Sequence, residues 1–320
     1  MTKNITTEII NAINGARSIL VCGHIRPDGD CVGSALAMRQ ICRNLGKSVD
    51  AVTGDMEKPA MFDFLPGYAD FCVANKNSYD LFISVDCATD KRLGENYKYF
   101  ASAENSVVID HHPTNCGYGK INYIDGTASS TCAILFELFE STGLIDRTTA
   151  TLLYTGLSTD TGHFMHSNTD SKVFGIAQKL CGYGLDVGKI NHDIYCNKSM
   201  RRIKLTARAL DSIRLYENGR IALMVITQDD LKACECKSED TEGLIDYASS
   251  VSGVKIAISM CEQPDSVFRV SWRSPSVNVA AAAEKFGGGG HELAAGCIIN
   301  GNRYDVAEKV LAAGAAALKQ

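Results

Sequence analysis

Four short apolar runs in the first half of the chain, separated by helical segments, constrain its fold most strongly. They lie at residues 18–24, 48–53, 80–86 and 105–110. Continuous apolar runs of this length are typical of strands buried on both faces, as in a parallel sheet covered by helices. The segments with helical patterns are 33–46, 129–143 and 148–162. The sequence therefore predicts an α/β domain built on a parallel sheet.

The pattern changes after about residue 214. Asn218-Gly219 lies between two strand-like runs and is the strongest short signal for a hairpin. A second pair of runs flanks residues 263–265, so this part predicts a smaller α+β domain. The length of 320 residues exceeds what one hydrophobic core usually serves. We predict three parts, namely a first domain over 1–195, a connecting helix over 196–213 and a second domain over 214–320.

Composition and charge narrow the classes of partner. The net charge of −5 argues against broad binding to long duplex nucleic acid, which needs a basic surface. A short anionic substrate held by metal ions and a few local cations is compatible with it. The 13 cysteines are odd in number and scattered, as expected of reduced core residues. We see no signal peptide and no apolar run long enough to span a membrane, so we expect a cytoplasmic protein without a membrane partner.

Acidic and histidine residues follow several of the apolar segments. In an open parallel sheet, residues just beyond the carboxyl ends of the strands meet in one crevice. Imidazole and carboxylate donors together suit Mn²⁺, Mg²⁺, Co²⁺ or Zn²⁺. The candidate metal ligands are His24, Asp28, Asp30, Asp86, His111 and Asp160.

Each of these residues also has a purely structural interpretation. An aspartate at a strand end is usually a cap or a turn former, and a pair of histidines is more often a surface feature. Their joint occurrence in this order favours a metal site. So many carboxylates would repel one another unless cations neutralised them. Two ions about 3.5–4 Å apart, bridged by one carboxylate, would activate a water and hold a phosphoryl oxygen.

Four segments resemble, in order and spacing, the four motifs of the DHH phosphoesterase family. They read HIRPDGDCVGSALA, SVDCA, VIDHHPTN and TGLSTDTGHF. A fifth segment, FGGGGHELAAG, resembles the signature of the DHHA1 substrate-binding domain. The resemblance covers nearly the whole chain. It implies a parallel-sheet DHH domain and a smaller α+β DHHA1 domain, with the active-site cleft between them.

The resemblance also implies roles for single residues. It implies two divalent ions, of which Mn²⁺ is favoured and Mg²⁺ or Co²⁺ is compatible. The first ion would be held by His24, Asp28 and Asp86. The ligands of the second ion would be Asp30, Asp86, His111 and Asp160, so that Asp86 bridges the two. In the catalytic set with Asp86, His112 would face the scissile phosphate and Asp110 would orient a neighbouring histidine.

The glycine run near the C-terminus has two interpretations. As structure, it is a flexible turn before the next element. As function, the backbone N–H groups of Gly288, Gly289 and Gly290 form an anion cradle to which His291 adds a donor. Arg273 could bind a phosphate bidentately, and the resemblance implies that it grips the nucleotide together with the Gly-Gly-Gly-His segment. Trp272 alternates with Arg273 along a strand, so we expect it to pack rather than to stack on a base.

The implied substrate is a short oligonucleotide (nanoRNA or a dinucleotide), or the 3′-phosphate of pAp. The resemblance is to the stand-alone branch with oligoribonuclease, exonuclease and pAp phosphatase activity. The main alternative is a phosphodiesterase for cyclic or linear dinucleotides, while an inorganic pyrophosphatase and a non-catalytic nucleotide-binding protein fit less well. A homodimer is compatible with the sequence, which does not give the oligomeric state, the cleavage polarity or the physiological metal.

Overall fold

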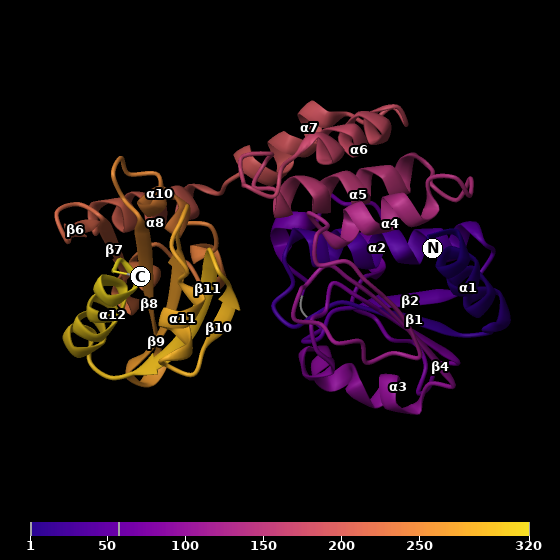
Figure 1. Cartoon of the computed structure of the whole chain (residues 1–320), viewed down its shortest axis with the longest axis horizontal. Coiled ribbons are helices and arrows are strands. Elements are labelled where there is room, and N and C mark those ends of the chain that lie inside the picture. The colour runs from indigo at the N-terminus through magenta and orange to yellow at the C-terminus, as the bar shows by residue number, and fades with distance from the viewer. Residues whose placement is uncertain (1, 57, 320) are drawn as a thin grey trace. The chain divides into compact units, whose positions relative to one another are not determined.

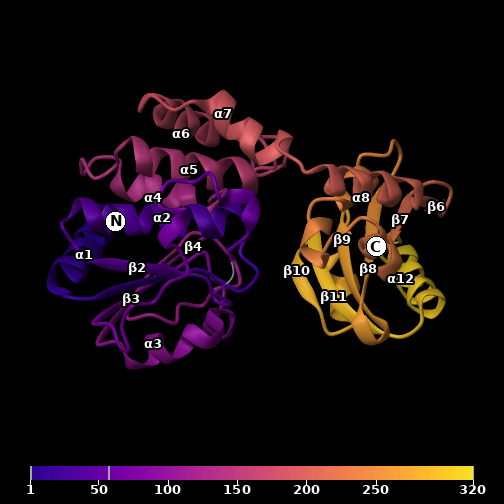
Figure 2. The ribbon, with the colours of Figure 1, turned by 180° about the vertical axis from the view of Figure 1, so that it is seen from behind.

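The computed structural model describes residues 2–56 and 58–319. The chain divides into two compact units, one up to Asn197 and one from Lys198 onward. Figure 2 shows the same two units from behind. The segment predicted as a connecting helix forms α8 (Met200–Asp211), which belongs to the second unit.

A five-stranded sheet with the order β2-β1-β3-β4-β5 forms the centre of the first unit, and all its neighbouring pairs are parallel. The strands are β1 (Ile19–Cys22), β2 (Val49–Val52), β3 (Leu81–Val85), β4 (Asn105–Asp110) and β5 (Ile121–Ile124). The predicted parallel α/β domain is confirmed. The sequence analysis missed β5, because this edge strand has four residues and buries only the first of them.

Helices cover both faces of this sheet, which explains the continuous apolar runs. Ile19 and Val21 of β1 pack into the larger core, and Leu20 and Cys22 pack into a second core on the opposite face. Figure 1 shows α2 and α4 on one side of the sheet and α3 on the other. The elements of this unit are α1 (Thr2–Gly15), α2 (Gly29–Asn44), η1 (Ala60–Phe62), η2 (Tyr68–Asp70), η3 (Asp90–Asn96), α3 (Tyr97–Ser102), α4 (Thr131–Phe139), α5 (Arg147–Asp160), α6 (Ser171–Cys181), α7 (Val187–Asn191) and η4 (His192–Cys196).

Helix α2 begins four residues earlier than predicted, at Gly29 rather than at residue 33. The reason is Asp28, whose carboxylate accepts the backbone N–H groups of Asp30 and Cys31 and so caps the helix. The polar Asp-Gly-Asp sequence looks like a loop, yet only its first residue lies outside the helix. Asp30 is therefore held in the first helical turn.

The second unit contains a six-stranded mixed sheet with the order β10-β11-β9-β8-β7-β6, in which only the β7–β8 pair is parallel. The predicted hairpin joins β6 to β7, and Asn218 and Gly219 both have positive φ, as a tight hairpin turn requires. The strands are β6 (Arg214–Tyr216), β7 (Ile221–Ile226), β8 (Ile256–Gln263), β9 (Val267–Arg273), β10 (Gly289–His291) and β11 (Ala294–Asn300). The predicted α+β character of this part is confirmed.

The helices of the second unit pack on both faces of its sheet and form two cores. They are α8, α9 (Gln228–Ala233), η5 (Ser238–Thr241), α10 (Ile245–Ser249), η6 (Pro264–Ser266), α11 (Ala280–Glu284) and α12 (Arg303–Ala317). Trp272 is fully buried in one of these cores, so the expectation that it packs is confirmed. Across the described residues of both units, no helix has the length and apolar character needed to cross a membrane.

Candidate metal centre

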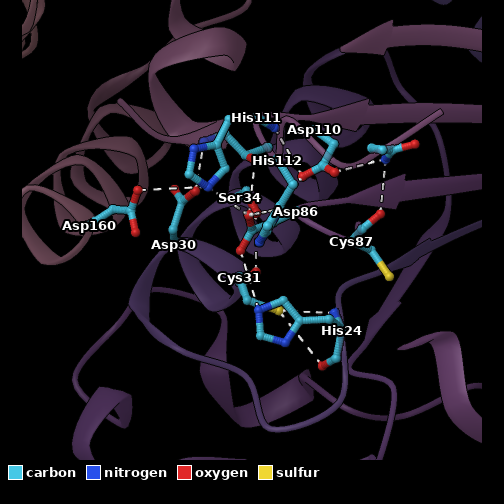
Figure 3. Close-up of polar contacts among 12 residues, drawn as sticks. His24, Asp30, Cys31, Ser34, Asp86, Cys87, Asp110, His111, His112 and Asp160 are labelled. Carbon is cyan, nitrogen blue, oxygen red and sulfur yellow. Dashed lines mark hydrogen bonds and ion pairs between the residues drawn. The ribbon is translucent and has the colours of Figure 1, made fainter. Parts of the chain in front are cut away.

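The predicted metal ligands of the first unit converge at the carboxyl ends of the strands of its sheet (Figure 3). Asp86 directly follows β3, His24 follows β1, and His111 follows β4. Asp30 lies in the first turn of α2, and Asp160 is the last residue of α5. These residues are far apart in the sequence. They meet because parallel strands end at the same edge and the helices begin or end there.

Asp86 lies between the two histidines of the cluster. Its Oδ2 is 3.5 Å from His24 Nε2, and its Oδ1 is 3.5 Å from His111 Nε2. His111 Nε2 is also 3.7 Å from Asp160 Oδ2, and His24 Nε2 is 3.9 Å from Asp28 Oδ2. A carboxylate whose two oxygens face two different donor groups has the geometry that a bridging ligand needs.

The backbone at Asp86 takes an uncommon conformation. Its φ is +53°, in the left-handed region that aspartate tolerates better than most residues. The Asp86 N–H donates to the carbonyl of Ile109, and the hydroxyl of Thr131 donates to Asp86 Oδ1 at 3.1 Å. The turn and these contacts fix a side chain that is almost completely buried.

Asp30 is oriented by the N-terminus of α4. Its carboxylate accepts the backbone N–H groups of Thr131 at 2.6 Å and Cys132 at 3.0 Å. Together with His111 and Asp160, Asp30 forms a group whose donor atoms lie within 4.8 Å of one another. Such a group can surround one ion.

Asp28 takes part differently, because its side chain is 63% exposed. One of its oxygens caps α2 and the other lies on the side of His24. His24, Asp86 and Cys31 form a second group of possible metal ligands, and their donor atoms also lie within 4.8 Å of one another. The sequence analysis treated Cys31 only as a core residue.

The ring of His24 is held through Nδ1, which lies 2.7 Å from the carbonyl oxygen of Ile25. If Nδ1 donates there, Nε2 carries the lone pair that a metal ion needs. The guanidinium of Arg92 also approaches Nδ1, at 3.1 Å, which the sequence analysis did not predict. No motif pointed to Arg92, since it lies within a polar stretch after Asp86.

A chain of hydrogen bonds supports His112. Its Nδ1 lies 2.7 Å from Oδ1 of Asp110, which is fully buried. Asn115 donates to Oδ2 of the same carboxylate at 2.8 Å and to the carbonyl of Cys87 at 3.1 Å. Asp110 thus lies where it can set the orientation of His112, and Asn115 is a further supporting residue that the sequence analysis missed.

The charges of the cluster perturb its titration. Burial disfavours the ionised form of Asp86, but the hydrogen bond and charge of His24 and the charges of the other histidines outweigh it and lower the pKa. Burial and the charge of Asp86 raise the pKa of Asp30 to about 7. Burial and the charge of Asp30 raise the pKa of Asp160. Burial opposes protonation of His111, yet the charges of Asp160, Asp86 and Asp30 raise its pKa to about 9.

These pKa shifts show that the clustered carboxylates are stable in their ionised form only with positive charge beside them. Without metal ions, protons on the histidines and on some carboxylates supply it. Divalent cations would supply it better, and the donor set of imidazole and carboxylate groups suits them. The residues present therefore fit a divalent metal site.

Apart from His112, the predicted substrate-binding residues lie in the second unit, on its sheet or directly before strand β10. Arg273 ends β9 and pairs with Ala294 of β11, which in turn pairs with His291 of β10. The three residues form one row across neighbouring strands, so their side chains share a face of the sheet. The glycine run enters strand β10 rather than forming only a flexible turn. A Cβ at Gly288 would lie 2.1 Å from the carbonyl oxygen of Gly296, so close backbone packing also explains that glycine.

Two family models match the chain. Residues 18–157 match the DHH family, N-terminal domain, and residues 224–320 match the DHHA1 domain.

Three curated relatives illustrate the similarity. The chain is 28% identical to the bifunctional oligoribonuclease and PAP phosphatase of Bacillus subtilis, over 96% of each chain. It is 30% identical to the probable bifunctional oligoribonuclease and PAP phosphatase of Streptococcus mutans, over 94% of each chain. It is 26% identical to the cyclic-di-AMP phosphodiesterase of Listeria monocytogenes, over 87% of this chain and 44% of that protein.

Solved structures show the same fold. An exopolyphosphatase-related protein from Bacteroides fragilis superposes with a TM-score of 0.90 at 23% identity, over 97% of this chain and 95% of that one. RecJ from Thermus thermophilus in complex with Mn²⁺ has a TM-score of 0.56 at 14% identity, over 98% of this chain and 54% of that one.

Gly156 in α5 tests the packing around Asp30. A Cβ there would lie 2.6 Å from Asp30 Oδ1 and 2.3 Å from the sulfur of Cys132. We expect Gly156→Ala to displace the carboxylate and to weaken Mn²⁺ binding by about 10-fold or more, measured by isothermal titration calorimetry. The control is Gly175→Ala in α6, where a Cβ would meet nothing within 4 Å. It should leave Mn²⁺ binding unchanged and stabilise the helix by about 0.5–1 kcal/mol. Equal Mn²⁺ affinities for both variants would contradict the expected displacement.

The raised pKa values of Asp30 and His111 predict that metal binding competes with protons. Both pKa values lie above their unfolded values, so the metal-free folded protein holds protons that ligation must remove. The stability that these protons give is present at low pH and is lost as the pH rises through about 7 and about 9. The increase in Tm caused by Mn²⁺ should therefore grow from pH 6 to pH 9. A shift that stays constant over this range in a thermal unfolding series would argue against proton-coupled binding.

Proposed function

The chain belongs to the DHH family of phosphoesterases, and we propose that it is a two-metal enzyme that hydrolyses short oligonucleotides and the 3′-phosphate of pAp. Family membership makes it a hydrolase that acts on phosphoester bonds. The observation that carries the two-metal proposal is the position of Asp86, whose two oxygens face His24 and His111 separately.

The donor groups divide around Asp86. We assign His24, Asp28 and Asp86 to one divalent ion, and Asp30, Asp86, His111 and Asp160 to the other. The combination of imidazole and carboxylate donors favours Mn²⁺, with Mg²⁺ or Co²⁺ as substitutes. When bound, two such ions supply an activated water and neutralise charge on the phosphoryl oxygens.

The other residues of the cluster orient the ligands, or donate hydrogen bonds to the ligands or to the substrate. Asp110 contacts Nδ1 of His112, and Asn115 donates to the other oxygen of the same carboxylate, so the orientation of the ring is fixed. We assign to His112 the role of a donor to an oxygen of the scissile phosphate. The buried carboxylate of Asp110 holds the imidazole in the orientation that this role needs. Thr131 and the N-terminus of α4 keep Asp86 and Asp30 in place without taking part in the reaction.

The substrate is assigned from the relatives and from the second unit. Two relatives that match along nearly their whole length are described as an oligoribonuclease and PAP phosphatase and as a probable one. Arg273 and His291 lie in one row of the sheet with Ala294 between them, and a guanidinium and an imidazole on the same face of a sheet can both donate to a phosphate group. We propose that they bind the substrate together with Gly288, Gly289 and Gly290. The cytoplasmic location and a homodimer stay predictions.

A second candidate activity is hydrolysis of cyclic or linear dinucleotides. It is favoured by the similarity to a cyclic-di-AMP phosphodiesterase over 87% of this chain. The same donor groups would serve that reaction, because only the substrate differs. A panel of pAp, linear dinucleotides, longer RNA, cyclic dinucleotides and pyrophosphate with Mn²⁺ tests both proposals. Turnover of pAp compared with turnover of cyclic dinucleotides separates them, because both proposals include linear dinucleotides. We expect the highest kcat/KM for pAp and dinucleotides.

Removal of the carboxylate of Asp86 tests the two-metal assignment. We expect Asp86→Asn to lower kcat for dinucleotide hydrolysis by at least about 1,000-fold, because several kcal/mol of charge stabilisation depend on it. Bound Mn²⁺, measured by metal analysis after gel filtration, should fall below that of the wild type. The exposed Asp63→Asn is the control and should keep both. Full Mn²⁺-dependent turnover by Asp86→Asn would refute the bridging role.

The role of the second unit is tested at Arg273 and His291. Arg273→Ala and His291→Ala should each raise KM by about 10-fold or more and change kcat little, since a lost charge-assisted hydrogen bond weakens binding by about 1.5–3 kcal/mol. The control is Arg214→Ala, at an exposed arginine of edge strand β6 in the same unit. Unchanged KM values for pAp and dinucleotides in both variants would remove these residues from the binding site.

A further inference from the structure

Arg92 brings a positive charge to the metal centre that the assignment above does not use. It lies in η3, and its Nη2 is 3.1 Å from His24 Nδ1. Its side chain is partly exposed. Within residues 2–56 and 58–319, no carboxylate forms an ion pair with it. A partly exposed guanidinium without a carboxylate partner among the described residues can bind an anion.

The backbone around Arg92 is firmly fixed. The carbonyl of Arg92 accepts the N–H of Ile25 at 2.9 Å, which joins η3 to the segment that follows β1. Gly94 packs so closely that a Cβ there would lie 2.2 Å from the carbonyl oxygen of Gly54. Asn96 donates to the carbonyl of Thr53 at 2.8 Å. The fold thus places Arg92 beside His24 through the main chain, independently of its own side chain.

The contact between Arg92 and Nδ1 of His24 is incompatible with a His24 that binds a metal ion through Nε2. The same Nδ1 lies 2.7 Å from the carbonyl oxygen of Ile25, which can only accept a hydrogen, and 3.1 Å from a guanidinium, which can only donate one. A histidine that binds a metal ion through Nε2 carries its hydrogen on Nδ1. Nδ1 then donates to Ile25 and has no lone pair for Arg92. Metal binding therefore leaves the guanidinium free to take another acceptor.

The position of Arg92 indicates which group can accept hydrogen bonds from its guanidinium when His24 binds a metal ion. Nδ1 and Nε2 lie on opposite sides of the imidazole ring, so Arg92 lies beyond His24 from the place of the ion. A phosphate held by the ions would therefore lie on the other side of the His24 ring from Arg92. Guanidinium groups bind phosphate bidentately and remain charged at any physiological pH.

We propose that Arg92 binds a second, non-scissile phosphate of the substrate. The inference rests on the proposed function, because it takes the substrate to be a nucleotide. In pAp and in the dinucleotide pApA, the only phosphate besides the scissile one is the 5′-phosphate. Arg92 accordingly selects nucleotides with a 5′-phosphate over those that carry the scissile phosphate alone.

The test compares pApA with ApA, which lacks the 5′-phosphate, for the wild type and for Arg92→Ala in Mn²⁺. For pApA, we expect KM to rise by about 10- to 100-fold in the variant, with kcat nearly unchanged. For ApA, the KM, or the Ki against pApA, should change by less than about 3-fold. Arg92→Lys should recover part of the loss, because it restores the charge without the bidentate geometry. The control is Lys91→Ala, at the exposed neighbour of Arg92.

Calorimetric titration with Mn²⁺ separates this role from support of His24. Arg92→Ala should bind Mn²⁺ at least as tightly as the wild type, since the variant removes a neighbouring cation. Weaker Mn²⁺ binding, or equal losses on pApA and ApA, would overturn the proposal while leaving the proposed function intact. A wild-type protein that hydrolyses neither dinucleotide would overturn the proposed function and this inference together.

Discussion

The need to neutralise several buried carboxylates at one sheet edge governs the first unit. Asp30, Asp86 and Asp110 are almost completely buried, and Asp160 belongs to the same cluster. In a medium of low polarity, such a group persists only with cations or hydrogen-bond donors around it. The chain supplies donors from the N-terminus of α4 and from Thr131, and it supplies imidazoles from the ends of two strands. Divalent ions would complete this charge balance, so the same carboxylates that the fold buries are those that suit a metal site.

The carboxylates differ in their pKa values because their neighbours differ. Asp86 accepts from His24 and Thr131 and lies beside a second histidine, and its pKa is lowered despite burial. Asp30 and Asp160 are buried against other carboxylates, and the pKa of each is raised. Of these three carboxylates, Asp86 is the one whose surroundings favour the ionised form. An ionised group facing two histidines is the natural starting point for two ion sites that share one ligand.

The sequence predicted those parts of the fold that depend on burial and local turn chemistry. The four predicted strands, β1 to β4, were recognisable because both of their faces are covered, and the Asn218-Gly219 hairpin was recognisable because its residues favour positive φ. The start of α2 was predicted too late, because the sequence does not distinguish an aspartate that caps a helix from one in a loop. The structure does so, since the Asp28 carboxylate accepts the N–H groups of the first helical turn. The edge strand β5 was missed because it is short and half-exposed. Arg92 and Asn115 were missed because their roles come from contacts between distant segments, which no local pattern encodes.

The donor groups assigned to the ions all lie between His24 and Asp160, within the first unit. The chemistry of phosphoester cleavage can therefore be held constant while substrate recognition changes elsewhere. Relatives described as oligoribonucleases and PAP phosphatases and one described as a cyclic-di-AMP phosphodiesterase match this chain at similar identity. Selection among such substrates must then come from groups that contact the substrate away from the reacting phosphorus. We propose that Arg92 in η3, and Arg273 with His291 on the second sheet, contribute to that selection.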